Sequence, residues 1–290
     1  MDGVLHLEPG RTARHPLRGD HGRALGVAGP KRNTGMAPAA AVVAPDVACA
    51  LDPLDARAVG HSVGTATAYR VVGLMDSVMS NPWLQVPLAD YERHMALPGI
   101  EQARMPAEIF DGVLRQFLPR SVAVLGCAGG NGFDRIPASV SRVVGVDINP
   151  NYLAAAEARF QGRFGSVELF VGDVERDEIA FAPVELVFAG LVLEYVNVEP
   201  AIARTRSMTT ANGRLVAVLQ LPGNGARRVS PSPFSSVQAL AGVIRLVPPL
   251  ALQQAAKTHG YAQSESRTVV SAGGKPFQVQ IFAPSLPRPG

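Results

Sequence analysis

Seven short, apolar-rich runs mark the chain from residue 122 onward. They cover residues 122–125, 143–146, 167–171, 184–189, 214–221, 267–270 and 277–282. Apolar runs of this length are typical of strands that are buried on both faces of a parallel sheet. Helical patterns separate them at residues 149–160, 199–209 and 251–259. The alternation predicts an α/β fold with a doubly wound, mostly parallel seven-stranded sheet.

The segments at the two ends of this pattern do not continue the alternation of strands and helices. Only residues 272–275, Ala-Gly-Gly-Lys, join the last two runs, so we expect a hairpin and an antiparallel C-terminal strand. Asn212 and Gly213 predict a turn into the strand at 214–221. Ahead of the sheet, residues 66–79 and 105–118 have helical patterns, which predict a helical N-terminal cap.

Composition divides the chain further. Residues 1–60 are rich in glycine, proline, alanine and arginine and contain no aromatic residue, so they cannot easily repay the entropy of ordering. We therefore expect a flexible or disordered tail over residues 1–60, the helical cap over residues 61–120 and the sheet domain over residues 121–285.

Charge and cysteine content narrow the possible partners. Residues 1–35 hold six basic and three acidic residues, which accounts for the whole formal charge of +3, so no nucleic-acid partner is predicted. The early apolar run at 37–44 is short of the about 20 residues that cross a bilayer, so no membrane association is predicted. Two cysteines favour a reducing, cytoplasmic location, and the scattered histidines predict no metal site.

A glycine-rich turn lies between the first two predicted strands, and a short helix is expected after it. The turn contains Gly126, Gly129, Gly130 and Gly132. Asp147 ends the second strand, 21 residues after Gly126. Such a turn lets the backbone approach a ligand, and a carboxylate at that place can accept both hydroxyls of a ribose. These features predict a site for a nucleoside-bearing cofactor.

The spacing of the glycines argues against a dinucleotide. A G-x-G-x-x-G pattern counted from Gly126 meets Ala128 and Asn131 where glycines are needed, and counted from Gly130 it meets Arg135. No lysine follows the glycines, as a Walker phosphate loop would require. A dinucleotide-dependent oxidoreductase is the less favoured alternative.

Several segments follow one another in the order of a known set of motifs. Residues 122–132 form a hydrophobic strand and glycine turn, residues 143–147 and 171–173 are strands that lead into acids, and residues 189–196 and 212–215 border the next two strands. Together with the final hairpin, they resemble class I S-adenosylmethionine-dependent methyltransferases over roughly residues 106–284. The resemblance implies a Rossmann-like fold with S-adenosyl-L-methionine as the cofactor.

The resemblance also implies roles for individual residues. Those that would wrap the methionine part of the cofactor are Gly126, Cys127, Ala128 and Gly130. Those that would border the sulfonium are Ala189 and Leu191. Asp147 would accept the ribose hydroxyls, and Ile148 would pack on the adenine. Asp173 would accept the adenine amine, while Val174 offers its backbone amide to the ring.

Two positions depart from the family pattern. Val124 stands where an acid is usual, and Ala128 stands where a glycine is usual. The missing acid removes an indirect hold on the amino group of the cofactor, which concerns affinity more than fold. Both cofactor acids also have a structural alternative, Asp147 as a cap of the helix at 149–160 and Asp173 as a turn residue.

The acceptor side is less defined. The candidates for a general base are His94, Glu194 and Tyr195. A solvated cap helix is the alternative for His94 and its neighbours, and a helix cap is the alternative for Glu194. The insertion at 230–247 commonly covers the acceptor in this fold. Its apolar residues, expected to form either a lid or core, are Phe234, Leu240, Ile244 and Leu246.

These observations favour a methyltransferase that acts on a small-molecule acceptor, with O-, N- or C-methylation left open. The protein would mainly position the reactants and exclude water. A catalytically silent S-adenosylmethionine-binding regulatory protein is the alternative.

Overall fold

The computed structural model describes residues 81–97, 100, 104–223, 229–271 and 273–285. All of them belong to one compact unit, Val63–Gly290. The predicted tail over residues 1–60 and the predicted helix over residues 66–79 lie outside the described residues.

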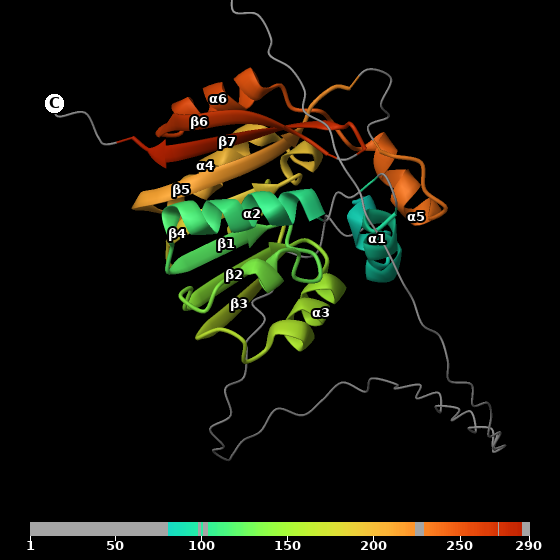
Figure 1. Ribbon diagram of the computed structural model, residues 1–290, viewed down its shortest axis with the longest axis horizontal. Helices are drawn as coiled ribbons and strands as arrows, with labels where there is room; N and C mark the ends of the chain where they lie inside the picture. The colour runs from blue at the N-terminus through green and yellow to red at the C-terminus, as the bar shows by residue number, and fades with distance from the viewer. Residues whose placement is uncertain (1–80, 98–99, 101–103, 224–228, 272, 286–290) are drawn as a thin grey trace, which may run out of the picture. The chain divides into compact units, whose positions relative to one another are not determined.

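Seven strands form one mixed sheet in the order β3-β2-β1-β4-β5-β7-β6 (Figure 1). The strands are β1 (Ser121–Leu125), β2 (Arg142–Asp147), β3 (Ser166–Val171), β4 (Val184–Gly190), β5 (Thr209–Gln220), β6 (Tyr261–Val270) and β7 (Pro276–Pro284). Neighbours pair in parallel from β3 to β5, whereas β7 is antiparallel to both β5 and β6. The predicted fold class is confirmed.

Helices cover both faces of the sheet. The longer ones are α1 (Leu88–Met95), α2 (Arg104–Phe117), α3 (Pro150–Phe160), α4 (Val198–Met208) and α6 (Pro249–Thr258). The short ones are η1 (Pro82–Gln85), η2 (Phe133–Arg135), η3 (Leu193–Tyr195), α5 (Ser235–Gln238) and η4 (Ala239–Gly242). Helices α2 and α3 pack on one face, with α2 in front in Figure 1, and α4 and α6 pack on the other. None of the described helices is both long and apolar enough to cross a membrane.

The central strands are buried on both sides, as their apolar runs predict. In β1, Val122 and Val124 face the layer under α2 and α3, while Ala123 and Leu125 face the layer under α4 and α6. All four side chains are at most 4% exposed. Successive residues of a strand point to opposite faces, so a strand between two helical layers needs apolar residues throughout.

Three local predictions differ from the structure. The expected helix after the glycine turn is only the three-residue η2. Strand β5 begins at Thr209, so Asn212 and Gly213 lie inside it, at an irregularity in its pairing with β4 rather than at a turn. Strand β6 begins at Tyr261 instead of residue 267. The prediction missed its first half because this edge strand has many polar, exposed residues and no continuous apolar run there.

Two segments that are distant in sequence meet at one end of the sheet. The Ser236 hydroxyl of α5 donates to Asp90 Oδ2 of α1 at 2.8 Å, and the two helices lie side by side in Figure 1. Val86, Val237 and Leu240 form a small buried cluster between them. The predicted cap and the predicted insertion therefore pack against each other.

Candidate functional site

The carboxyl ends of four neighbouring strands line one cavity. Gly126 follows β1, Asp147 ends β2, Asp173 follows β3 and Gly190 ends β4. The cavity lies where the strand order reverses between β1 and β4, the place at which open α/β sheets bind ligands. Residues of α1, α2 and the insertion complete its wall.

The glycine turn is held against the end of β2. The amides of Gly126 and Cys127 donate to the Val146 carbonyl at 2.8 and 3.1 Å, and the Ala128 amide donates to Asp147 Oδ2 at 2.8 Å. Gly126 has a φ of +67° and Ala128 a φ of +47°. The glycine usual at the position of Ala128 thus has a conformational reason, because a left-handed alanine costs about 1 kcal/mol.

Asp147 braces the turn and also lines the cavity. Its Oδ1 accepts a hydrogen bond from the Asn149 amide at 2.9 Å. The cap of α3 is Asn149 itself, which accepts from the Asn151 amide at 3.0 Å, so Asp147 is not that cap. Burial raises the pKa of Asp147 to about 6, although backbone amides partly offset this effect. Its remaining lone pairs could accept the hydroxyls of a ribose.

Asp173 is a turn residue that also lines the cavity. Its Oδ1 accepts a hydrogen bond from the Glu175 amide at 2.8 Å, which forms the turn after β3. It also lines the cavity, and burial raises its pKa. Ile148 and Val174, the residues that follow the two acids, line the cavity as well. An apolar surface next to a carboxylate fits an adenine ring with its amine donor.

The cavity gathers most of the predicted cofactor residues. Those that line it are Gly126, Ala128, Asp147, Ile148, Asp173, Val174 and Leu191. Cys127, Gly130 and Ala189 do not line it. Cys127 and Ala189 are buried in the two core layers, and burial raises the pKa of the Cys127 thiol. At Gly130 an added Cβ would lie 2.4 Å from the Phe160 ring, so packing against α3 requires the glycine.

Glu194 is a buried carboxyl in the wall of the same cavity. Its Oε1 accepts from the Gln220 amide at 2.6 Å, while its Oε2 has no hydrogen-bond partner among the residues that the structure describes. Burial raises the pKa of Glu194 to about 7. The cap of α4 is Asn197, so Glu194 does not take that alternative role.

Two further ionisable residues, His94 and Lys275, lie close enough to interact electrostatically. His94 is 2% exposed and lines the cavity, and its Nδ1 has no partner within the described part of the chain. Lys275 Nζ donates to Gln220 Oε1 and Ser230 Oγ, both at 3.3 Å. Burial lowers the pKa of both His94 and Lys275, and the charge of Lys275 lowers that of His94 further. Both effects favour the neutral form of the His94 imidazole.

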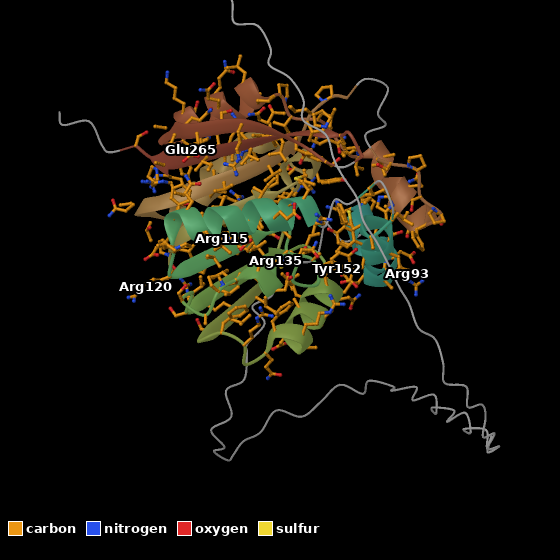
Figure 2. The ribbon with its side chains drawn as sticks, viewed as in Figure 1. Arg93, Arg115, Arg120, Arg135, Tyr152 and Glu265 are labelled. Atoms are coloured by element: carbon orange, nitrogen blue, oxygen red, sulfur yellow. The ribbon has the colours of Figure 1, made fainter. Side chains whose placement is uncertain are left out.

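Six aromatic side chains line the cavity, and a tryptophan and three tyrosines among them form one cluster. The Trp83 ring lies 4.9 Å from Tyr195 and 5.8 Å from Tyr91, and Tyr91 stacks on Tyr152 at 6.0 Å. Tyr152, labelled in Figure 2 on the side of α3 toward α1, donates its hydroxyl to the Val86 carbonyl at 2.8 Å. Burial raises the pKa of Tyr195, which favours the protonated phenol.

Two polar residues of the cavity wall, and a lysine bonded to one of them, carried little signal in the sequence. Asn131 counted only as a mismatch to the dinucleotide pattern, and Lys275 lies in a predicted hairpin turn, where a solvated lysine is usual. Gln220 ends a buried apolar strand, and a polar residue in that place was the one available hint.

The strand order, the antiparallel β7 and the glycine turn tied to an acid at the end of β2 define a class I, Rossmann-like methyltransferase domain. Residues 123–217 match the sequence model of a family described as a methyltransferase domain. The chain therefore carries a class I S-adenosylmethionine-dependent methyltransferase domain. The acids and apolar residues of the cavity fit the adenosine part of this cofactor.

Solved structures similar to this chain are distant in sequence. A TehB-like SAM-dependent methyltransferase from Corynebacterium glutamicum is 20% identical over 68% of this chain and 96% of its own, with a TM-score of 0.45. DesVI of Streptomyces venezuelae is 14% identical over 69% and 99%, with a TM-score of 0.48. The [4+2]-cyclase SpnF is 13% identical over 62% and 82%, with a TM-score of 0.49. No curated protein matches the chain, and these likenesses identify no acceptor.

Proposed function

We propose that the domain transfers the methyl group of S-adenosylmethionine to a small-molecule acceptor, with Glu194 taking up the acceptor's proton. One observation carries the proposal. A single cavity joins the glycine turn and Asp147 to Glu194, a buried carboxyl whose Oε2 has no partner among the described residues. An unpartnered buried carboxyl is costly to a fold, so a ligand that supplies the missing hydrogen bond would explain its presence.

Residues at the strand ends would hold the cofactor. Asp147 would accept the ribose hydroxyls and Asp173 the adenine amine, with Ile148 and Val174 packed against the ring. Backbone groups of the glycine turn would contact the methionine part, and Leu191 would border the sulfur. When bound, S-adenosylmethionine supplies an electrophilic methyl group on a sulfonium.

The remaining lining of the cavity supports a small and largely apolar acceptor. Its apolar residues include Met95, Phe110, Phe188, Val237, Leu240 and Ile244. Of the predicted lid residues, Leu240 and Ile244 line the cavity, while Phe234 packs in the cluster next to α1. The bond between Ser236 and Asp90 joins the two covering segments. A cover of this kind excludes water and holds the reactants in line.

Glu194 is suited to a proton transfer during the reaction. As the methyl–sulfur bond breaks and the methyl–acceptor bond forms, the proton of an acceptor O–H or N–H would pass to Glu194 Oε2. S-adenosylhomocysteine would leave as a neutral thioether. The pKa of Glu194, raised by burial to about 7, keeps both of its forms accessible near neutral pH. His94, neutral and unpartnered at Nδ1, would orient the acceptor.

Ligand-dependent thermal shifts test the cofactor, and label transfer tests the reaction. We expect stabilisation by S-adenosylmethionine and S-adenosylhomocysteine, and transfer of labelled methyl into the small-molecule fraction of a metabolite extract. The Glu194→Gln variant should lose about 100-fold in rate while it binds S-adenosylhomocysteine like the wild type. Stabilisation by NADH alone contradicts the proposal. Binding of S-adenosylmethionine without any transfer favours the silent regulatory protein.

A further inference from the structure

The amino-acid end of the cofactor lacks its usual acid in this chain. At the end of β1, Val124 places an apolar side chain in the cavity wall. The nearby carboxylate of Asp147 is already bonded to the amides of Ala128 and Asn149. An α-ammonium and an α-carboxylate in this place need other polar partners, since buried charges without hydrogen bonds are costly.

Asn131 and Tyr91 form a polar pair next to the glycine turn. Asn131 Nδ2 donates to the Tyr91 hydroxyl oxygen at 2.8 Å, and both residues line the cavity. This bond uses one N–H of the Asn131 amide and one lone pair of the Tyr91 hydroxyl oxygen. Asn131 Oδ1 and the Tyr91 hydroxyl proton are left without a hydrogen-bond partner among the residues that the structure describes. The pair thus offers one free acceptor and one free donor.

We propose that Asn131 and Tyr91 together bind the amino-acid end of S-adenosylmethionine, in place of the absent acid at Val124. The inference rests on the proposed function. The Tyr91 hydroxyl would donate to the α-carboxylate, and Asn131 Oδ1 would accept from the α-ammonium. Two neutral dipoles suit this zwitterion, because its own charges cancel and no unpaired protein charge is buried.

The surrounding contacts hold the pair in place. The Tyr91 ring stacks on Tyr152, and burial raises the pKa of Tyr91, so its hydroxyl keeps the proton that it would donate. Arg159 donates to the Gly129 carbonyl at 3.1 Å and to Glu92 Oε2 at 3.1 Å, which ties the glycine turn to α1. A preorganised donor and acceptor lose little freedom when the ligand binds.

Two ligands that differ only at the amino-acid end test the inference by calorimetry. S-adenosylhomocysteine contains this end, whereas 5′-methylthioadenosine keeps the adenosine and the sulfur but lacks it. We expect Tyr91→Phe and Asn131→Ala each to bind S-adenosylhomocysteine about 10-fold more weakly, and 5′-methylthioadenosine within about twofold of the wild type. Tyr152→Phe is the matched control, since its hydroxyl is already bonded to the Val86 carbonyl. It should change both affinities by the same factor.

The remaining outcomes distinguish a failure of this inference from a failure of the proposed function. Equal losses for the two ligands in Tyr91→Phe and Asn131→Ala, or unchanged affinity for S-adenosylhomocysteine, overturn the inference and leave the proposed function intact. A wild-type protein that binds neither ligand overturns the proposed function itself. Melting curves without ligand establish that the variants are folded, and the two substitutions test the pair independently.

Discussion

The Ala128 amide donates a hydrogen bond to Asp147 Oδ2 across 2.8 Å and so joins the turn after β1 to the end of β2. The bond orients a carboxylate that lines the cavity, and it holds Ala128 in the left-handed region. The geometry of the turn and the chemistry of the acid therefore depend on each other.

Asp147 should determine the affinity for the cofactor. Replacement of Asp147 by Asn removes the charge that would strengthen two ribose hydrogen bonds, so we expect about 100-fold weaker binding of S-adenosylhomocysteine in calorimetry. Asp134→Asn is the control, because this carboxylate is exposed on η2 beside Arg135. Affinity of Asp147→Asn within about threefold of the wild type would refute the ribose role.

Glu194 should make the stability of the ligand-free protein depend on pH. Its folded-state pKa of about 7 lies above the ordinary value of 4.5, so the folded state binds the proton more tightly than the unfolded state. Glu194 makes its full contribution to the free energy of unfolding below pH 4.5. As the pH rises from 4.5 to 7, this contribution of about 3 kcal/mol is lost.

Urea unfolding at pH 4.5 and pH 8 measures this effect. Glu194→Gln keeps an acceptor for the Gln220 amide but cannot ionise. Between pH 4.5 and pH 8, the free energy of unfolding of the variant should rise by about 3 kcal/mol relative to that of the wild type. A stability difference that stays constant with pH would show that the carboxyl ionises without cost in the folded state.

Ala128→Gly should relieve backbone strain. At a φ of +47° the Cβ is unfavourable, and the relief offsets the larger entropy of glycine in the unfolded chain. We expect the free energy of unfolding to be unchanged or to rise by up to about 1 kcal/mol. The control is Ala154→Gly, at an exposed position in α3, which should cost about 1 kcal/mol. Similar losses in both variants would argue against strain at Ala128.

Gly130→Ala should be the more damaging of two glycine substitutions. Its Cβ would come within 2.4 Å of the Phe160 ring at a φ of +92°, so we expect a loss of about 3 kcal/mol. Gly162 has a φ of +75°, but no atom lies within 4 Å of an added Cβ. Gly162→Ala should therefore lower the free energy of unfolding by only about 1 kcal/mol. Thermal or urea unfolding compares them, and equal losses would mean that Phe160 moves aside freely.

Local departures from the predicted pattern show where sequence reasoning failed. Asn212 and Gly213 favour a turn by their residue types, but they lie inside β5, at an irregularity in its pairing with β4. The polar first half of β6 is a strand only because β7 supplies its hydrogen bonds. In both cases the partner strand decides, and its register is not encoded in the local run of residues.

The sequence by itself determined the fold class and predicted the two acids that line the cavity. Strands buried on both faces need continuous apolar residues, and acids such as Asp147 and Asp173 follow these strands directly, so both signals are local. Only the tertiary structure brought Glu194 to the Gln220 amide, Lys275 to Gln220 and Asn131 to Tyr91. These contacts join distant segments, and burial, which packing alone creates, shifts the pKa of Glu194 and leaves its Oε2 unpartnered within the described chain.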